Sequence, residues 1–426
     1  MKNYLSRLGL NIIYLLIFIS CFLNLPKLCA FLIKVSLFKP KFFRQNRSDK
    51  KVFIVLNRKI GIRDLEIIHK STNFKFEFLF LKRSIVRVPL YFFRSKKKSI
   101  FNYYNNPVTD KDFFNQNERD KKNHEKFWYD VIYSLKNYFI KKNLNFITFN
   151  YTYPSESALF AACKKNDIPV KLWHKEGVIT DGDAAYQTKK RWVKFRGVFK
   201  NFTSISVYNE LIKKKLIEIS KENKNKITVN GCPRTLDYIL KKKYYRKPKT
   251  ILLLFFNSKR GIPNTYKNKN LNWMKSQKNV IKILNELSKN KYLNIIVKVK
   301  SNYKNNTRNL IDKRIKIFKS GTAENYIYKA DIIIGHNSSS TIESIINGKY
   351  VMVPFFEKNS KLKKYLLNFN DEIIYTSQTK MKNKILNLIN KKSFFPLNYN
   401  KHNNTINYYF GSPKNVVKKY LNFLNN

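Results

Sequence analysis

The stretch from residue 331 to residue 356 places the tightest constraint on the fold of this chain. It begins with an Ile-rich run, Asp331–Gly335, which is too short for a helix and suits a strand buried on both faces of a parallel sheet. Small and polar residues follow, and apolar residues then recur at helical spacing as far as Gly348. A second strand is expected over Tyr350–Phe356. The stretch therefore predicts a strand, a Ser-rich loop, a helix and another strand, as in α/β proteins.

The Ser-rich loop of this unit is suited to binding a phosphate group. It places the N-terminus of a helix at the carboxyl edge of a parallel sheet, where free backbone N–H groups attract anions. Glu343 would lie one turn inside the helix, within reach of a hydroxylated group such as a ribose attached to the phosphate. The alternative is that the serines only cap the helix and that Glu343 is a solvated acid. The residues that this hypothesis assigns to the loop are Asn337, Ser338, Ser339 and Ser340.

Two series of alternating strands and helices flank a stop signal at Gly231–Arg234, where glycine and proline interrupt regular structure. The first series contains a strand, a helix and a second strand over residues 145–173, which is the pattern of a βαβ unit. The second series begins with an apolar strand at residues 250–256. We therefore expect an α/β fold of two Rossmann-like domains, over residues 46–245 and 246–426, with a cleft between them.

An apolar segment, residues 1–45, precedes these domains. Leu10–Leu25 is nearly all apolar but shorter than a comfortable membrane span, and a second apolar run follows Lys27. A cleaved signal peptide, a single short span and a buried helix of the globular domain all fit this pattern. We favour a monotopic hairpin around Pro26, held to anionic lipid by the flanking Lys and Arg residues. This interpretation predicts a protein at the cytoplasmic face of the inner or plasma membrane.

The charge balance favours anionic partners but identifies none of them. The chain has 85 Lys and Arg residues against 27 Asp and Glu residues, a net charge of +58. Lys, Asn and Ile are abundant throughout, as a skewed genome composition would produce. No stacking motif of a known RNA or single-strand module is visible, so no specific nucleic-acid partner is expected. The four cysteines are far apart, which indicates neither a zinc site nor a disulfide framework.

Three short motifs together resemble the CDP-glycerol glycerophosphotransferase branch of the GT-B-fold glycosyltransferases. Trp173-His174 falls where that family has Trp-His-Gly-Thr, and Ile227–Asp237 is similar to its Gly-x-Pro-Arg-x-Asp stretch. Ala330–Phe356 resembles its Ala-Asp strand, Ser-Ser loop and following helix. The resemblance covers roughly residues 145–356. The spacing of the motifs also resembles the nucleotide-sugar 2-epimerases, in which His-x-Glu-x-Gly and a Glu in the loop helix recur.

The chain departs from the glycerophosphotransferase pattern at three places, so the resemblance implies a nucleotide-activated donor without specifying glycerol phosphate. The replacements are Lys175-Glu176 for Gly-Thr, His336-Asn337 for Asp-Tyr, and Ser301-Asn302 for His-Pro.

The resemblance implies a membrane-associated transferase of surface polysaccharide or cell-envelope biosynthesis. It would move a glycosyl or polyol-phosphate group from a nucleotide-activated donor to a glycan or lipid-linked acceptor. The first Rossmann-like domain would bind the acceptor and the second the nucleotide donor. A nucleotide-sugar 2-epimerase is the alternative enzyme, and a non-catalytic polyanion- or membrane-binding protein is the alternative from another class.

Transfer to a hydroxyl requires a base for its proton. His174 follows the strand Val170–Trp173 at the carboxyl edge of a sheet, and the pKa of a histidine is near neutral. We expect His174 to act as this base, while Glu176 orients it or binds the acceptor. A structural histidine at a strand end is the alternative.

The leaving diphosphate requires positive charge, and here no metal or other cofactor is expected. Candidate groups are the amides of the Ser-rich loop together with Arg260, Lys298 and Lys300. Arg234 would bridge the two domains or form an ion pair at their boundary. Asp181 and Asp183 form an Asp-x-Asp pair in a glycine turn, for which we favour a turn or acceptor-site role over metal binding.

Overall fold

The computed structural model describes residues 2–44, 51–57, 59–94, 117–149, 154–174, 196–239, 249–255, 273–299, 310–357, 360–390 and 399–426. The chain divides into two compact units. Unit 1 contains residues 1–176, 191–233 and 414–426, and unit 2 contains residues 177–190 and 234–413. The sequence placed a stop signal at Gly231–Arg234 and the domain bounds at residues 245 and 246, and the chain passes from unit 1 to unit 2 between Pro233 and Arg234. The segment after residue 413, assigned by the sequence to the second domain, packs within unit 1.

Unit 1 is built on a six-stranded parallel sheet with the strand order β2-β1-β3-β4-β5-β6. Its strands are β1 (Lys51–Asn57), β2 (Glu77–Lys82), β3 (Asn143–Thr148), β4 (Val170–Trp173), β5 (Ser204–Val207) and β6 (Ile227–Val229). Helices that follow the strands are α3 (Lys59–Ser71), α4 (Arg83–Arg94), α7 (Glu118–Asn137), α8 (Pro154–Lys165) and α10 (Glu210–Ile219). The order of strands reverses between β1 and β3, and open α/β sheets bind ligands at such a point.

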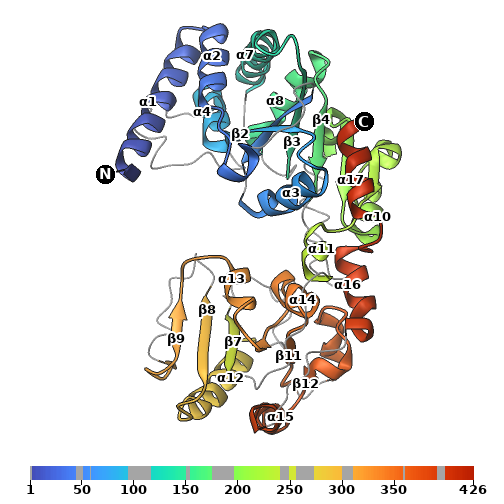
Figure 1. Cartoon of the computed structure of the whole chain (residues 1–426). Helices are drawn as coiled ribbons and strands as arrows, with labels where there is room; N and C mark the ends of the chain where they lie inside the picture. The colour runs from blue at the N-terminus through green and yellow to red at the C-terminus, as the bar shows by residue number, and fades with distance from the viewer. Residues whose placement is uncertain are drawn as a thin grey trace. The chain divides into compact units, whose positions relative to one another are not determined.

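The apolar N-terminal segment forms two helices, α1 (Lys2–Phe22) and α2 (Pro26–Ser36), which lie side by side, and α2 begins at Pro26 (Figure 1). One face of α1 packs against α4, where the Tyr14 hydroxyl bonds to the Ser84 hydroxyl and Phe18 contacts Phe92 edge-on. Helix α2 packs against α7. In the part of the chain that the structure describes, no helix combines the length and the apolar character needed to cross a membrane.

Unit 2 has a second six-stranded parallel sheet, with the strand order β12-β11-β10-β7-β8-β9. Its strands are β7 (Thr250–Phe255), β8 (Asn294–Val299), β9 (Lys316–Phe318), β10 (Ile332–Ile334), β11 (Tyr350–Pro354) and β12 (Ile374–Tyr375). Its helices are α11 (Arg234–Ile239), α12 (Trp273–Leu287), α13 (Ala323–Ile327), α14 (Ser339–Ile346), α15 (Gln378–Asn390) and α16 (Asn403–Phe410). Apolar side chains of α12 and α15 pack with the central strands into one core.

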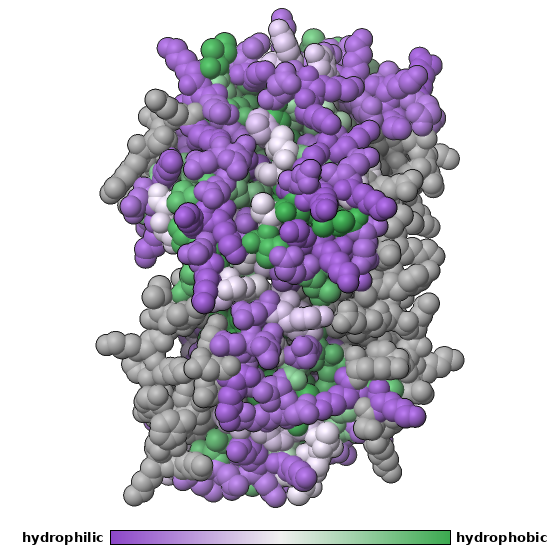
Figure 2. Space-filling model, turned by 90° about the vertical axis from the view of Figure 1, so that its right-hand side faces the viewer, coloured by the Kyte–Doolittle hydropathy of each residue, from purple (hydrophilic) through white to green (hydrophobic). Residues whose placement is uncertain are grey.

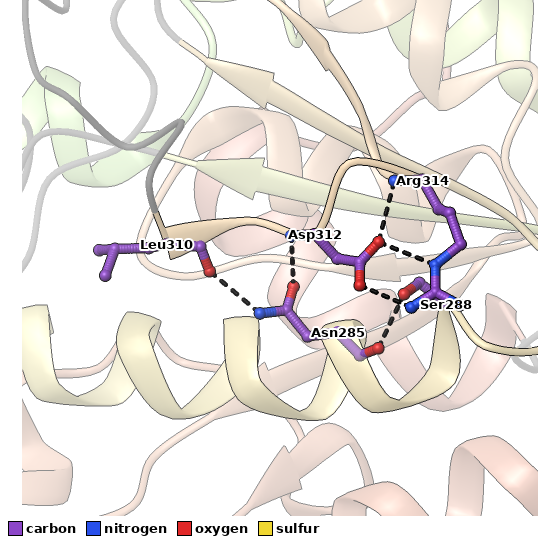
Figure 3. A network of polar contacts seen from close by, with 5 residues as sticks. All are labelled: Asn285, Ser288, Leu310, Asp312 and Arg314. Atoms are coloured by element: carbon purple, nitrogen blue, oxygen red, sulfur yellow. Dashed lines mark hydrogen bonds and ion pairs between the residues drawn. The ribbon is translucent and has the colours of Figure 1, made fainter.

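A polar network fixes the turn that leads into β9 against α12 (Figure 3). The Asn285 side chain donates to the Leu310 carbonyl and accepts from the Asp312 N–H, both at 3.0 Å. Asp312 in turn binds the guanidinium and the N–H of Arg314, which holds the pKa of its carboxyl well below its usual range. These contacts fasten the turn immediately before β9 to α12.

The last helix, α17 (Val416–Asn425), returns to unit 1 and covers the end of β4. The Tyr420 ring stacks on the Trp173 ring at 4.1 Å between centroids, and Lys51 donates to the Asn425 carbonyl. A cation at this end of a helix also opposes the negative end of the helix dipole.

The face shown in Figure 2 is predominantly hydrophilic, with apolar side chains in small separate patches.

The strands expected within residues 145–173, at residues 250–256 and within residues 331–356 are confirmed to within two residues at their boundaries. Two helices differ from expectation. The helical spacing of apolar residues predicts a helix over Phe127–Lys141, whereas α7 begins at Glu118, because Asn117 caps it by accepting the Asp120 N–H. Helix α16 was not predicted. Short 3-10 helices complete the described chain: η1 (Lys41–Arg44), η2 (Arg196–Asn201), η3 (Lys221–Lys226), η5 (Ser360–Tyr365), η6 (Asp371–Ile373) and η7 (Tyr399–His402).

Candidate functional site

The Ser-rich loop lies at the ligand-binding edge of unit 2. It connects β10 to α14, and β10 pairs with β7, the neighbour at which the order of strands reverses. Both strands point their carboxyl ends toward this loop because the sheet is parallel. The predicted strand, loop and helix are confirmed, and the loop occupies the switch point of the sheet.

Close packing inside the loop fixes its backbone. The Thr341 hydroxyl donates to the His336 carbonyl at 2.7 Å, and Ser338 caps α14 by accepting the Thr341 N–H. A Cβ on Gly335 would come within 2.4 Å of the Thr341 hydroxyl oxygen, so glycine leaves the room that the loop needs. Ser338 is the residue that caps α14, and Ser339 is exposed at the first position of that helix. The first N–H groups of a helix have no partner within it, and they remain suited to an anion.

Asn337, predicted to bind the donor, supports the loop from behind in this structure. Its side chain is buried, and its oxygen accepts the Leu367 N–H at 3.0 Å. The contact ties the Ser-rich loop to the segment that follows η5. A direct role of Asn337 in donor binding stays a prediction.

Glu343 forms a buried ion pair with Arg234. The Arg234 guanidinium on α11 contacts the Glu343 carboxylate on α14, and it also lies 5.7 Å from the centre of the Phe410 ring on α16. The solvated position considered for Glu343 is therefore wrong, because its side chain is 9% exposed. The ion pair holds together the three helices behind the Ser-rich loop and orients the carboxylate in the second turn of α14.

Removing one partner of this ion pair should lower the unfolding free energy. Replacing Arg234 with methionine leaves the Glu343 charge buried without its cation, and we expect a loss of about 3–5 kcal/mol of unfolding free energy. The double variant Arg234→Met/Glu343→Leu removes both charges and should recover most of that loss. Chemical denaturation of the three proteins measures the effect. Equal stability of the single variant and wild type would show that the pair contributes nothing.

His336, in the same loop, is fully buried at the end of β10. Burial disfavours its charged form and lowers the pKa of the imidazole to about 3. Between about pH 6.5 and pH 3 the unfolded chain therefore binds a proton that the folded chain does not, so stability falls as the pH is lowered through this window. We expect the unfolding free energy of wild type to fall by about 2 kcal/mol more than that of His336→Asn between pH 7 and pH 5. Parallel pH dependence of the two proteins in urea titrations would contradict this.

A cation and two aromatic rings occupy the carboxyl ends of β8 and β9. Lys298 is buried, donates to the Val299 carbonyl at 2.6 Å and has its pKa lowered by burial. Its ammonium group lies 5.9 Å from the centre of the Tyr326 ring, which packs on the Phe318 ring at 4.9 Å. Both rings are half-buried. The sequence predicted Lys298 but did not single out either ring.

In unit 1, His174 lies at the carboxyl end of β4, as predicted. Its N–H donates to the Ser206 carbonyl at 2.8 Å, which continues the pairing of β4 with β5. The side chain is 2% exposed. Beside it, the Tyr420 hydroxyl donates to the Gly231 carbonyl at 3.1 Å while the Tyr420 ring covers Trp173. Tyr420 thereby joins the Trp-His motif to the Gly-x-Pro-Arg stretch, and nothing in the sequence pattern indicated this contact.

A second polar group at the same edge of unit 1 was also missed. Glu156 is fully buried in the first turn of α8, where its carboxylate accepts from Arg83 and, at 2.9 Å, from the Thr148 hydroxyl. Burial raises its pKa, although the Arg83 charge acts against that shift. The group fastens the ends of β2 and β3 beside the point where the order of strands reverses.

Five predicted site residues lie outside the described part of the chain: Glu176, Asp181, Asp183, Arg260 and Lys300. Within the described residues, no group of three or more His, Cys, Asp or Glu side chains is arranged to hold a metal ion.

No family model matches this chain, and no curated protein matches it. Solved structures do. A protein of Listeria monocytogenes assigned as a UDP-N-acetylglucosamine 2-epimerase matches with a TM-score of 0.50 at 12% identity, over 88% of this chain and 95% of the other. The UDP-GlcNAc 2-epimerase of Neisseria meningitidis, bound to UDP-GlcNAc, matches with a TM-score of 0.43 at 13% identity, over 88% of this chain and 99% of the other. The wall teichoic acid polymerase TagF matches with a TM-score of 0.48 at 10% identity, over 100% of this chain and 98% of the other.

Matches at such low sequence identity show a likeness of fold alone. Together with two units that each carry a six-stranded parallel sheet, the likeness to the Listeria structure defines the chain as a protein of the GT-B fold. The GT-B resemblance expected from the sequence is thereby confirmed. A transferase or epimerase that uses a nucleotide-activated sugar or a related donor is compatible with this fold, and the fold alone does not choose between them.

Proposed function

We propose that this protein is a membrane-associated transferase that takes a glycosyl or polyol-phosphate group from a nucleotide-activated donor. The acceptor would be a surface polysaccharide or a lipid-linked precursor at the cytoplasmic face of the membrane. The observation that carries the donor half of the proposal is the Ser-rich loop, which brings the N-terminus of α14 to the switch point of the unit 2 sheet. Such a position suits the diphosphate of a nucleotide.

Further groups at the same sheet edge suit the rest of a nucleotide. Lys298 offers a cation for a phosphate, and the half-buried rings of Phe318 and Tyr326 offer flat apolar faces for a base. Glu343, oriented by Arg234, could accept hydrogen bonds from a ribose. No metal is part of this proposal, because backbone N–H groups and cationic side chains can stabilise the leaving diphosphate.

In unit 1, we assign the acceptor proton to His174 with support from Glu176, and the acceptor to the surrounding edge of the sheet. A nucleotide-sugar 2-epimerase is the alternative that the sequence motifs left open. Epimerisation needs no acceptor and no membrane, but requires acid and base groups on both faces of the sugar. Incubation with the donor separates the two, because an epimerase converts it without any second substrate.

The first test is donor binding. The full chain is screened by thermal shift and calorimetry against CDP, UDP, GDP, ADP and CMP and their activated sugars and polyols. We expect one nucleotide to bind selectively with little dependence on ionic strength, since a few groups hold it in place. A non-catalytic polyanion binder would instead bind many anions and lose affinity steeply with salt.

Two variants locate the bound donor. Tyr326→Ala should weaken nucleotide binding by about 1–3 kcal/mol, the usual contribution of an aromatic ring stacked on a base. Ser339→Glu places a carboxylate where the phosphate is expected and should abolish binding, although an acid in the first turn favours the helix itself. The matched control is Tyr292→Ala, which removes a largely exposed tyrosine of the same unit. Unchanged affinity in both site variants would exclude this edge as the donor site.

A further inference from the structure

Residues 12–42 carry most of the exposed large hydrophobic side chains of the described residues. Seventeen large hydrophobic side chains are exposed among the described residues, and ten of them lie between Ile12 and Phe42. Unit 2 contributes only three of the seventeen: Tyr292, Leu310 and Leu386. Contiguous apolar surface of this kind marks an interaction site, whereas scattered single residues do not.

On α1 the exposed side chains form a stripe opposite the face that packs on the protein. They recur at helical spacing from Ile12 to the end of the helix and are Ile12, Leu15, Leu16, Ile19 and Phe22, with exposed fractions of 36% to 72%, and exposed Leu23 follows directly after the helix. The opposite face buries Tyr14, Ile17, Ser20 and Cys21. Because α1 is fastened to α4 through Tyr14 and Phe18, the stripe faces outward while the helix stays attached to unit 1.

Helix α2 places positive charge beside this stripe. Its exposed residues are Lys27, Phe31, Lys34 and Val35, so two cations alternate with two apolar side chains on one face. The Lys34 ammonium group lies 4.5 Å from the centre of the ring of exposed Tyr138, the C-cap residue of α7. Exposed Lys41 and Arg44 follow in η1. Apolar side chains next to cations and a tyrosine match the boundary between the acyl chains and anionic headgroups of a bilayer.

We infer that the exposed stripe of α1 and the exposed face of α2 dock together on an anionic lipid surface, with both helices lying in the plane of the interface. This inference deepens the proposed function, since it names the surface that brings a lipid-linked acceptor to the enzyme. The stripe sinks between headgroups while the opposite face of α1 keeps its contacts with α4. Lys27, Lys34, Lys41 and Arg44 contact the negatively charged headgroups.

The test is sedimentation of the full chain with vesicles of phosphatidylcholine, alone or mixed with phosphatidylglycerol. We expect strong binding to the mixed vesicles and weak binding to the neutral ones. Leu15→Glu/Phe22→Glu should reduce binding at least about ten-fold, because two apolar side chains are lost and two charges must be buried. Lys27→Gln/Lys34→Gln should reduce binding about five-fold per charge on the mixed vesicles alone. The matched control Leu310→Glu/Leu386→Glu changes exposed leucines of unit 2 and should bind as wild type.

Three results would overturn the inference. The chain could bind neither kind of vesicle, or Leu15→Glu/Phe22→Glu could bind as wild type. Light scattering could also show a dimer that becomes a monomer in this variant, and a second copy would then be what covers the stripe. Nucleotide binding is measured without lipid, so its failure counts against the proposed function, whereas failed vesicle binding with nucleotide binding intact counts against this inference alone.

Discussion

Replacing His174 with alanine should lower the rate of group transfer by about 10²–10⁴-fold, the usual contribution of a general base. His174 lies at the carboxyl end of β4, where its backbone is fixed by the Ser206 carbonyl. The nucleotide is proposed to bind unit 2, so donor affinity should be unchanged. The rate is measured as release of the nucleotide from whichever donor the binding screen identifies.

If His174 has only a structural role, its replacement should change stability and not the rate of the folded molecules. A variant of a second buried histidine, His124, provides the comparison. His124 is also buried in unit 1, where it accepts a hydrogen bond from the Trp128 ring at 3.0 Å on α7. His124→Gln should reduce stability with little effect on the rate of the molecules that remain folded. If His174→Ala transfers the group at the wild-type rate, or if both variants lose activity only in proportion to their unfolded fraction, His174 is not the base.

Removing the Tyr420 side chain should destabilise unit 1 by about 3–5 kcal/mol, the range for large aromatic residues in a core. Its ring is fully buried against Trp173, and its hydroxyl donates to the Gly231 carbonyl. Tyr420→Phe keeps the stacking and loses only the hydrogen bond, so it should cost about 1–2 kcal/mol. Chemical denaturation followed by fluorescence measures both losses.

The control for this series is Tyr292→Ala, which should change stability by no more than about 0.5 kcal/mol because that side chain is largely exposed. A chain ending at Pro413 should lose more stability than Tyr420→Ala, since Phe423 also contacts the Trp173 ring. Wild-type stability of the shortened chain would show that α17 is not part of the core of unit 1.

The sequence by itself determined the local elements and their order. Short apolar runs bounded by glycine, proline and polar residues correctly predicted most strands of both sheets, because burial on both faces requires continuous apolar residues. Strand β2 was not resolved, since aromatic and basic residues alternate around it without a clear period. It also predicted the strand, Ser-rich loop and helix of residues 331–356, since small residues and helical spacing are local properties. The resemblance that these motifs carried gave the GT-B fold, which the structure confirms.

Contacts between residues distant in sequence were decided only by the tertiary structure. Arg234 and Glu343 are 109 positions apart, and Tyr420 is 189 positions from Gly231, so no periodicity could have paired them. The same holds for the apolar N-terminus. Its composition allowed a span, a signal peptide, a hairpin or a buried helix, whereas packing on α4 and α7 decides which side chains are buried and which remain exposed. Composition specifies how apolar a helix is, and only its neighbours in space determine which face they cover.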